Sequence, residues 1–312
     1  MNRFLSWPGA KYRQMDQILS VLPERSEPWK VIIEPFFGTG ALTWELLSPD
    51  SPQRIFAAEK DDHLRRWWEH LLKSPANMIA EMADIRERFA EAKNDRDIFD
   101  DLRDGYNREF HNHPRELQTS ALLWVLVYQS TNNLARFNSK GGYNQTWGKG
   151  RNVPDPKEIF GEVEQAALAR FARRAYNERK PLYTDFRDLF KEFFLFFSGG
   201  CIKAEDCICF LDPPYIVRTE TYQKGCWTLD DEKSLWFWCR RMDEQGIPWV
   251  MTNYLSKDDS VSKKVVEHPM LTEILDTWRT VPIDRKLDTR PTGSSTPVEE
   301  VAILGKAVKE TA

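Results

Sequence analysis

Short apolar runs that end in glycine, proline or charge alternate in this chain with longer stretches of helical spacing. Strands are predicted at 31–33, 55–58, 181–184, 207–211 and 248–251. Helices are predicted where apolar residues recur every three or four positions, at 15–22, 41–47, 64–127, 156–176 and 232–245. Two last strands, 273–279 and 300–304, are predicted to form an antiparallel edge. The mixture predicts an α/β protein.

The first predicted strand leads into a glycine turn at 34–40, Glu-Pro-Phe-Phe-Gly-Thr-Gly, and then into a helix. This order is typical of nucleotide-binding units, because glycine lets the backbone approach the ligand closely. The turn lacks the third glycine of the dinucleotide fingerprint and the Gly-Lys-Ser/Thr of a P-loop. The pattern therefore disfavours pyrophosphate and leaves a nucleoside without phosphates open as the ligand.

The second predicted strand ends at Glu59, about twenty residues beyond the glycine turn. An acid at this place can accept hydrogen bonds from ribose hydroxyls. The alternative is an ordinary acid at a strand end on the surface.

The run Cys-Ile-Cys-Phe-Leu at 207–211 reads as a buried strand and delivers Asp212-Pro213-Pro214-Tyr215 to its carboxyl end. Ligands bind at that edge of an open α/β sheet. The two prolines have no N–H and fix their own φ, so they make a stiff loop beside a carboxylate and an aromatic ring. Such a loop suits a planar group with an amino donor, such as a nucleobase. The alternative is a turn that only ends the strand.

A polar stretch at 129–144 interleaves amides, cations and aromatics around Gly141-Gly142, in a pattern that resembles a hairpin built to touch DNA. Asn and Gln read adenine, and Arg reads guanine, in the major groove. An ordinary polar loop is the alternative. The candidate DNA-binding residues are Asn132, Asn133, Leu134, Arg136, Asn138 and Lys140.

The local charge supports this interpretation better than the total charge does. The whole chain of 312 residues carries a net charge of −4, with 41% hydrophobic and 29% charged residues, which are values of a globular protein. The loop from Arg136 to Arg151 nevertheless contains four cations and no acid. Such a local surplus is typical of a nucleic-acid contact, whereas a solvated helix face is the alternative for part of the basic surplus between Ser120 and Lys180.

Other features of the composition bear on compartment and metal binding. No apolar run reaches membrane-spanning length, and residues 1–5 open no signal peptide. The five cysteines are odd in number, which favours buried thiols in a reducing cytoplasm. No Cys-x-x-Cys pair occurs, which argues against zinc. We therefore expect a cytoplasmic protein without membrane contact or metal, as a monomer or weak dimer.

Six motifs follow one another along the chain: Trp7-Pro8-Gly9-Ala10-Lys11-Tyr12, the 34–40 turn, Glu59, Asn132 to Asn138, Asp185-Phe186 and Asp212-Pro213-Pro214-Tyr215. Their order is that of the DNA adenine methyltransferase (Dam-like) family, which the chain resembles from Phe4 to Leu304. The resemblance implies methylation of the exocyclic amino group (N6) of adenine in duplex DNA, with S-adenosylmethionine as cofactor. It also implies a Rossmann-like seven-stranded sheet with an inserted, mostly helical target-recognition domain that carries a β-hairpin. The implied boundaries are 1–63 and 177–312 for the catalytic domain and 64–176 for the recognition domain.

The resemblance assigns roles to single residues. Trp7 and Lys11 would line the cofactor site, Glu59 would hold the ribose, and Arg136 would read a guanine. The full cofactor set would be Trp7, Lys11, Glu34, Phe36, Gly38, Gly40, Glu59, Asp185, Phe186 and Asp212. The family often has a base-reading lysine where this chain has Ser6, and often inserts an aromatic where this chain has Thr131. We therefore expect GATC or a relaxed variant as the target. Host-type methylation, phage or prophage protection and restriction-modification all stay open as biological roles.

The proposed catalytic residues are Asp212, Pro213, Pro214 and Tyr215. If the Asp212 carboxylate and the Pro213 carbonyl accept both amino hydrogens, the nitrogen lone pair is freed for in-line attack on the methyl group. Tyr215 would stack on the adenine, which must be flipped out of the duplex to be reached. Two alternatives are a methyltransferase acting on RNA or on a protein glutamine amide, and a catalytically silent DNA-binding homologue.

Overall fold

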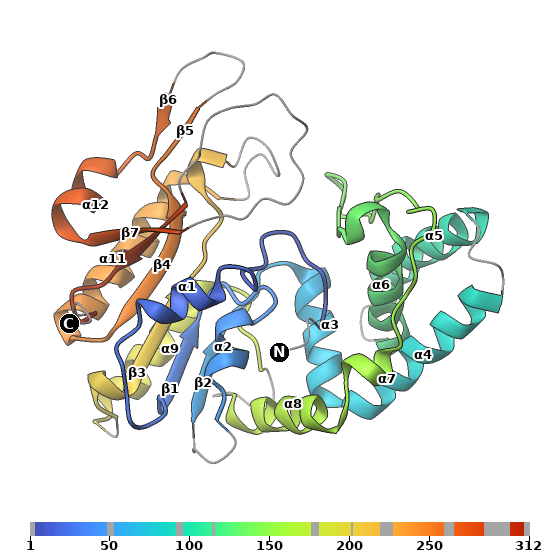
Figure 1. The fold of residues 1–312 in the computed structure, drawn as a ribbon, viewed down its shortest axis with the longest axis horizontal. Coiled ribbons are helices and arrows are strands. Elements are labelled where there is room, and N and C mark those ends of the chain that lie inside the picture. Colours follow the sequence, from blue (N-terminus) through green and yellow to red (C-terminus); the bar gives the residue numbers. More distant parts are fainter. Residues whose placement is uncertain are drawn as a thin grey trace. The chain divides into compact units, whose positions relative to one another are not determined.

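The computed structural model describes residues 4–48, 53–91, 96–113, 116–175, 181–200, 202–218, 227–258, 265–283 and 300–308. The chain divides into two compact units (Figure 1). The sheet unit comprises Lys11–Phe37, Asp50–Ala58 and Asp185–Ala312. The helical unit comprises Met1–Ala10, Gly38–Pro49 and Glu59–Thr184. Each unit is therefore assembled from three segments that are distant in sequence.

A mostly parallel sheet of six strands forms the centre of the sheet unit, in the order β2-β1-β3-β4-β8-β7. The strands are β1 (Val31–Glu34), β2 (Arg54–Ala57), β3 (Cys207–Leu211), β4 (Trp249–Tyr254), β7 (Arg279–Ile283) and β8 (Glu300–Leu304). The first four run parallel, whereas β8 is antiparallel to both β4 and β7. Every residue of β1, β3, β4 and β8 is buried, as expected of apolar strands covered on both faces.

The carboxyl ends of β1, β3 and β4 meet at one edge, because these strands are parallel neighbours. Ile33 pairs with Cys209, and Leu211 pairs with Met251. β8 runs the other way, so its first residue, Glu300, lies at the same edge opposite Tyr254. The sheet therefore gathers the residues that follow or end three strands at the edge where ligands bind in such folds.

The described helices of the sheet unit are α1 (Met15–Ser20), α9 (Phe186–Ser198), α11 (Leu229–Gln245) and α12 (Leu271–Thr277). Aromatic residues pack α9 onto the sheet and onto α11. Phe193 of α9 contacts Phe56 of β2, with ring centroids 5.4 Å apart. Trp238 of α11 stacks on Phe190 of α9 at 5.3 Å. Two 3₁₀ turns, Ala204–Asp206 and Ile216–Arg218, flank β3, and a separate pair of short strands is formed by β5 (Ser256–Asp258) and β6 (Val265–Glu267).

The helical unit confirms the helical stretch predicted for 64–127. Its helices are α2 (Ala41–Leu46), α3 (Asp62–Lys73), α4 (Pro75–Glu91), α5 (Arg96–Asn112), α6 (Leu117–Gln129), α7 (Pro156–Ile159) and α8 (Glu162–Arg174). The first described residue, Phe4, is fully buried among them. Its ring lies 5.2 Å from that of Trp44, and its carbonyl accepts a hydrogen bond from Trp124 Nε1 at 2.9 Å. These contacts hold residues 4–10 on the helical unit.

Two of the predicted strands are wrong. Residues 273–279 form most of α12 and the first residue of β7, because Leu271, Ile274 and Trp278 follow helical spacing. The antiparallel edge itself is confirmed, with β7 beginning at Arg279. Residues 181–184 form no regular strand; Tyr183 is an isolated bridge residue whose carbonyl accepts a hydrogen bond from the Glu59 N–H at 2.8 Å. The seventh strand implied by the resemblance stays a prediction.

Two further predictions need correction in detail. The single helix predicted at 156–176 is divided at Phe160-Gly161 into α7 and α8. The predicted hairpin at 129–144 contains no regular strand; it is a loop closed by isolated bridges, Phe137 to Tyr143 and Ser130 to Trp147. The loop between α6 and α7 is called the recognition loop below, and comprises residues 130–151.

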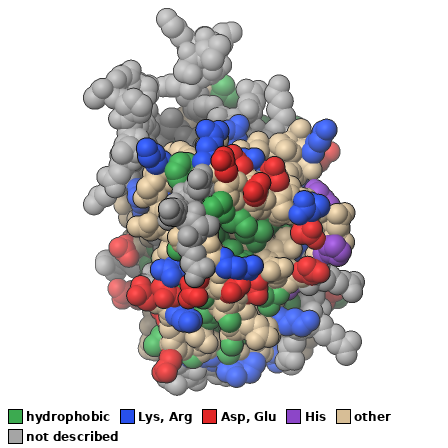
Figure 2. All heavy atoms as spheres, turned by 90° about the vertical axis from the view of Figure 1, so that its right-hand side faces the viewer, with side chains coloured by type: hydrophobic (Ala, Val, Ile, Leu, Met, Phe, Trp, Pro, Cys, Tyr) green, Lys and Arg blue, Asp and Glu red, His purple; other side chains and the backbone are tan. Residues whose placement is uncertain are grey.

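The remaining sequence predictions concern thiols, membrane and surface charge. Cys207, Cys209 and Cys239 are free and buried, which confirms the prediction for the first two; the other two cysteines lie outside the described residues. Within the described ranges, no helix is long and apolar enough to cross a membrane. On the face shown in Figure 2, acidic and basic side chains are intermixed, with hydrophobic side chains exposed between them.

Candidate active site

Asp212 follows β3 directly, and both of its carboxylate oxygens are held by side chains from other segments of the sheet unit. Its Oδ2 accepts a bond from Lys11 Nζ at 2.8 Å. Its Oδ1 accepts from Thr252 Oγ1 at 2.6 Å and from the Tyr215 hydroxyl at 2.8 Å. The Asp212 side chain keeps 19% exposure, whereas Lys11 and Thr252 are buried. The carboxylate is thus fixed in orientation while one part of it stays accessible.

The remainder of the Asp-Pro-Pro-Tyr loop divides into a buried and an exposed part. Pro213 is buried and Pro214 is exposed, and the chain then enters the 3₁₀ turn at Ile216–Arg218. The Tyr215 ring packs edge-to-face on Tyr254, with centroids 4.9 Å apart. Burial, followed by the charges of Asp212 and Glu300, raises the pKa of Tyr215 well above 10. Tyr215 therefore acts as a neutral hydroxyl.

Glu300 completes the group at this edge and was missed by the sequence analysis. Its Oε1 accepts from the Tyr215 hydroxyl at 2.7 Å and lies 3.5 Å from Lys11 Nζ. Its Oε2 lies 3.4 Å from the Tyr254 hydroxyl. The signal in the sequence was a glutamate at the start of an apolar strand, and the polar end Thr252-Asn253-Tyr254 of a strand that begins with apolar residues.

The glycine turn and Glu59 are brought together in the helical unit. Gly38 and Gly40 both have positive φ, +50° and +66°, which a residue with a side chain rarely adopts. Glu59 Oε2 accepts from the Gly38 N–H at 2.8 Å, and Oε1 accepts from the Asp61 N–H at 2.8 Å. Burial and the neighbouring Asp61 carboxylate raise the pKa of Glu59 to about 7. A β-carbon built on Gly38 would meet nothing within 4 Å, so there is open space above the turn.

Three aromatic rings of the sheet unit form a second cluster of interest. Phe36 lies 5.3 Å from Phe186 and 5.5 Å from Trp227, measured between centroids. Trp227, which the sequence analysis missed, is fixed by a hydrogen bond from its Nε1 to the buried Glu232 at 2.5 Å. Flat rings at this spacing offer stacking surface for another ring.

The other predicted cofactor residues have clear local surroundings. Asp185 caps α9, since its side chain accepts from the Arg187 N–H at 2.8 Å. Glu34 is buried at the end of β1. Trp7, in the helical unit, lies 6.0 Å from the ring of Phe137 in the recognition loop. Of the predicted set, Trp7, Gly38, Gly40 and Glu59 belong to the helical unit, and the others belong to the sheet unit.

The recognition loop is held in shape by its own polar groups. Asn132 and Asn133 both have positive φ, 62° and 52°. Asn138 Oδ1 accepts from the N–H groups of Lys140 and Gly142, so this side chain holds the turn. Thr131 Oγ1 lies within 3.3 Å of Thr146 and Trp147 oxygens and is therefore engaged inside the loop.

Neighbouring helices anchor the base of the recognition loop. The His63 ring of α3 is stacked between Phe110 and Phe137, at centroid distances of 3.8 and 3.9 Å. Burial lowers the pKa of His63 to about 4, so the ring is neutral near pH 7. The Asn107 side chain of α5 donates to the Tyr143 carbonyl and accepts from the Tyr143 N–H.

The loop's cations project from this anchored base. All four of them are exposed: Arg136, Lys140, Lys149 and Arg151. Leu134 keeps 37% exposure beside the two asparagines. The loop therefore presents charge and a hydrophobic side chain on a supported backbone.

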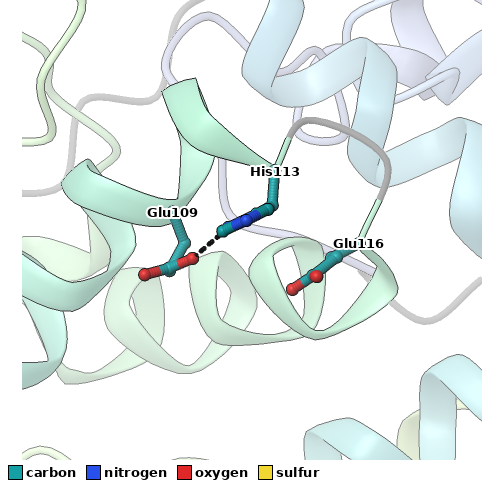
Figure 3. Close-up of side chains that lie close together, drawn as sticks. All are labelled: Glu109, His113 and Glu116. Atoms are coloured by element: carbon teal, nitrogen blue, oxygen red, sulfur yellow. Dashed lines mark hydrogen bonds and ion pairs between the residues drawn. The ribbon is translucent and has the colours of Figure 1, made fainter.

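One cluster outside these sites has the spacing of metal ligands. Glu109 and His113 at the end of α5 and the neighbouring Glu116 place one ligand atom each within 4.8 Å of one another (Figure 3). Glu109 of α5 and His113, directly after its end, are four residues apart, and the hydrogen bond that the protonated His113 ring donates to the Glu109 carboxylate raises the pKa of His113. An exposed helix pair explains this geometry without a ligand.

Comparison with known proteins places these observations in a family. Residues 7–283 match the family model described as D12 class N6 adenine-specific DNA methyltransferase. The chain is 25% identical to the Type II methyltransferase M.MjaIII of Methanocaldococcus jannaschii, over 82% of this chain and 85% of the relative. It is 26% identical to a DNA adenine methylase of Vibrio cholerae and 25% identical to that of Escherichia coli K12, each over 80% of both chains.

Proposed function

The chain belongs to the D12 class of N6 adenine-specific DNA methyltransferases, and we propose that it transfers a methyl group from S-adenosylmethionine to a flipped adenine in duplex DNA. The observation that carries this proposal is the fixed carboxylate of Asp212 at the carboxyl edge of β3. The alternatives of an RNA or protein substrate are outcomes of the test below.

The contacts of Asp212 indicate which of its atoms meets the substrate. Each carboxylate oxygen has two lone pairs. Oδ1 lies within bonding distance of both the Thr252 and Tyr215 hydroxyls, whereas Oδ2 accepts one bond among the described residues, from Lys11. We propose that Oδ2 accepts a hydrogen from the adenine amino group and that the Pro213 carbonyl accepts the other. The bound amino nitrogen is then pulled towards tetrahedral geometry, and its lone pair is aimed at the methyl group.

The sheet-unit site also suits the charge that develops during transfer. The amino nitrogen becomes positive as it bonds to the methyl carbon, and its proton must leave afterwards. A carboxylate held in place before the reaction stabilises this charge without rearrangement. Asp212 is the proposed acceptor of that proton, and the ring of Tyr215 is proposed to stack on the flipped base.

We propose, on the family resemblance, that the protein binds S-adenosylmethionine, which supplies the methyl group when bound, and each unit by itself contains residues that fit part of a nucleoside. In the helical unit, the open space above Gly38 and the carboxylate of Glu59 fit the ribose. In the sheet unit, the rings of Phe36, Phe186 and Trp227 fit the cofactor's adenine. The remaining predicted contacts, from Trp7, Lys11, Glu34, Gly40 and Asp185, are proposed on the family resemblance.

We further propose that the mostly helical stretch 64–176 recognises the target through the recognition loop. Its four exposed cations and the anchored backbone support this role. Arg136 is the proposed guanine reader, with Asn132, Asn133, Leu134, Asn138 and Lys140 as further DNA contacts. Because Thr131 is engaged inside the loop and Ser6 replaces a lysine, we propose GATC or a relaxed variant as the site.

The test is methylation of mixed-sequence duplex DNA with methyl-labelled S-adenosylmethionine, followed by mapping of the modified adenines. We expect label in N6-methyladenine at one short sequence, and none after Asp212→Ala. Label in RNA or protein added to the same reaction, with none in DNA, would overturn the proposal.

A further inference from the structure

Glu300 is a buried carboxylate at the reactive edge to which the family resemblance gave no role. It begins β8 and is directly opposite Tyr254 of β4. Only 2% of the residue is exposed. Burying a carboxylate is costly unless charge and hydrogen bonds compensate for the lost water. Its partners therefore show what holds it there.

Two of those partners, Tyr215 and Lys11, also hold Asp212. Glu300 Oε1 lies 2.7 Å from the Tyr215 hydroxyl and 3.5 Å from Lys11 Nζ. Tyr215 and Lys11 each contact Asp212 at 2.8 Å. Glu300 is thus joined to Asp212 by two bridges, one through a hydroxyl and one through an ammonium group.

In the hydroxyl bridge, the two carboxylates share one hydrogen-bond donor. Tyr215 has a single hydroxyl hydrogen, yet its oxygen lies within bonding distance of both Asp212 and Glu300. When that hydrogen is donated to Glu300, Asp212 Oδ1 keeps the hydrogen bond from Thr252 Oγ1 at 2.6 Å. Glu300 therefore helps to fix where the Tyr215 hydroxyl lies, and through that hydroxyl it helps to fix the orientation of the Asp212 carboxylate.

The ammonium bridge sets the charge of the site. Lys11 lies beside Asp212 Oδ2, the atom proposed to meet the amino group, and its positive charge opposes the positive charge that develops on the nitrogen. A second carboxylate at 3.5 Å offsets Lys11. With both acids ionised, the group of Lys11, Asp212 and Glu300 carries one net negative charge.

We propose that Glu300 is a positioning residue for methyl transfer: it acts on Asp212 through Tyr215 and Lys11, fixing the carboxylate and keeping the site negative. The inference rests on the proposed function, because it assigns Glu300 to the step at Asp212. Glu300 itself does not touch the substrate in this account. Its effect is therefore on turnover and not on cofactor binding.

Single-turnover methyl transfer by Glu300→Gln tests the inference, since glutamine keeps the size and loses the charge. We expect the transfer rate to fall by about 10- to 100-fold, with unchanged calorimetric affinity for S-adenosylmethionine and unchanged KM for DNA. The matched control is Asp206→Asn, at the other end of β3. Asp206 is also buried and bonded to a lysine, Lys30, at 3.0 Å, and its variant should keep the wild-type rate.

A second variant covers the case in which Glu300→Gln does not fold. Tyr215→Phe removes only the bridging hydroxyl, and it should lower the transfer rate with cofactor affinity retained. In the Glu300→Gln background, Tyr215→Phe should lower the transfer rate by a smaller factor than it does in wild type, because the hydroxyl bridge between Asp212 and Glu300 is already altered. Two results would overturn the inference while leaving an active enzyme. One is a wild-type transfer rate in Glu300→Gln. The other is a double variant whose loss of rate equals the product of the two single losses. Absence of methylation by the wild-type protein would overturn the proposed function instead.

Discussion

The reactive edge of the sheet unit and the recognition loop of the helical unit are both rich in polar side chains, but they use them differently. At the edge, Asp212 and Glu300 bond to other side chains and are largely removed from water. In the loop, Asn138 and Thr131 bond to the loop's own backbone, and the cations are exposed. We therefore propose that the edge serves chemistry at one fixed carboxylate, whereas the recognition loop presents exposed positive charge on a backbone held by neighbouring helices. Variants at the edge should therefore change rate, and variants in the loop should change which DNA is chosen.

The largest effect is expected at the edge. Asp212→Asn keeps the shape and removes the charge that offsets the developing positive nitrogen. We expect the single-turnover rate to fall by at least about 10²–10³-fold, with cofactor affinity retained in calorimetry. Asp206→Asn at the start of β3 is the control and should be close to wild type. If Asp206→Asn lowered the single-turnover rate as much as Asp212→Asn does, the loss would reflect damage to the fold and not a role of Asp212 in the reaction.

A second prediction concerns the carboxylate that faces the glycine turn. Glu59→Gln should weaken S-adenosylmethionine binding by roughly 10- to 100-fold, since a hydrogen bond to a charged group is worth about 1.5–3 kcal/mol. Because the pKa of Glu59 is about 7, the ionised acceptor is lost as the pH falls below that value. Wild-type affinity should therefore be weaker at about pH 6 than at about pH 8, and Glu59→Gln should remove this dependence.

The raised pKa of Glu59 has the opposite effect on folding stability, which should fall and not rise with increasing pH. A carboxyl whose folded pKa lies above its ordinary value of 4.5 contributes stability at low pH, and loses it as the pH rises through about 7. Unfolding of the cofactor-free protein should show this slope in wild type and less of it in Glu59→Gln. A cofactor affinity that does not vary with pH in wild type would remove Glu59 from the binding site.

In the recognition loop, Arg136→Ala should relax specificity at one guanine by about 1–3 kcal/mol. Sequencing of methylated adenines, with sites ranked by rate, measures this directly. Lys149→Ala, an exposed cation in the same loop, is the control and should leave the ranking unchanged. Identical site profiles for wild type and Arg136→Ala would mean that Arg136 contacts only the backbone, or no DNA at all.

The smallest effect is expected for the loop lysines. Lys140→Ala and Lys149→Ala should each weaken binding to every sequence about equally and reduce the slope of log affinity against log salt by about 1. Fluorescence anisotropy over a salt series gives both quantities. A sequence-dependent loss would show that one of these lysines reads bases.

Much of the fold could be predicted from the sequence where the signal is local. The apolar runs at 207–211 and 248–251, the glycine turn and the Asp-Pro-Pro-Tyr loop all lie where the hydrophobic pattern and the prolines place them. The strand predicted at 273–279 is wrong, because Leu271, Ile274 and Trp278 follow helical spacing and most of this stretch forms α12. Residues 181–184 lack the ladder that would make them a strand.

The missed site residues depend on pairing that no local pattern reveals. Glu300 meets Tyr215 because β8 pairs with β4 in a register that sets Glu300 opposite Tyr254. Thr252 reaches Asp212 because β3 and β4 are parallel neighbours. Trp227 was unremarkable in the sequence until Phe36 and Phe186 lay beside it. Partners far apart in the chain are found only once the sheet order is known.

The central claim is that the carboxylate of Asp212 prepares an adenine amino group in DNA for methylation. Nucleoside analysis by mass spectrometry tests it directly, after duplex DNA has been incubated with labelled S-adenosylmethionine and either wild type or Asp212→Ala. The account predicts labelled N6-methyldeoxyadenosine from wild type and none from the variant. Label on another nucleoside, or the same yield from Asp212→Ala, would contradict it.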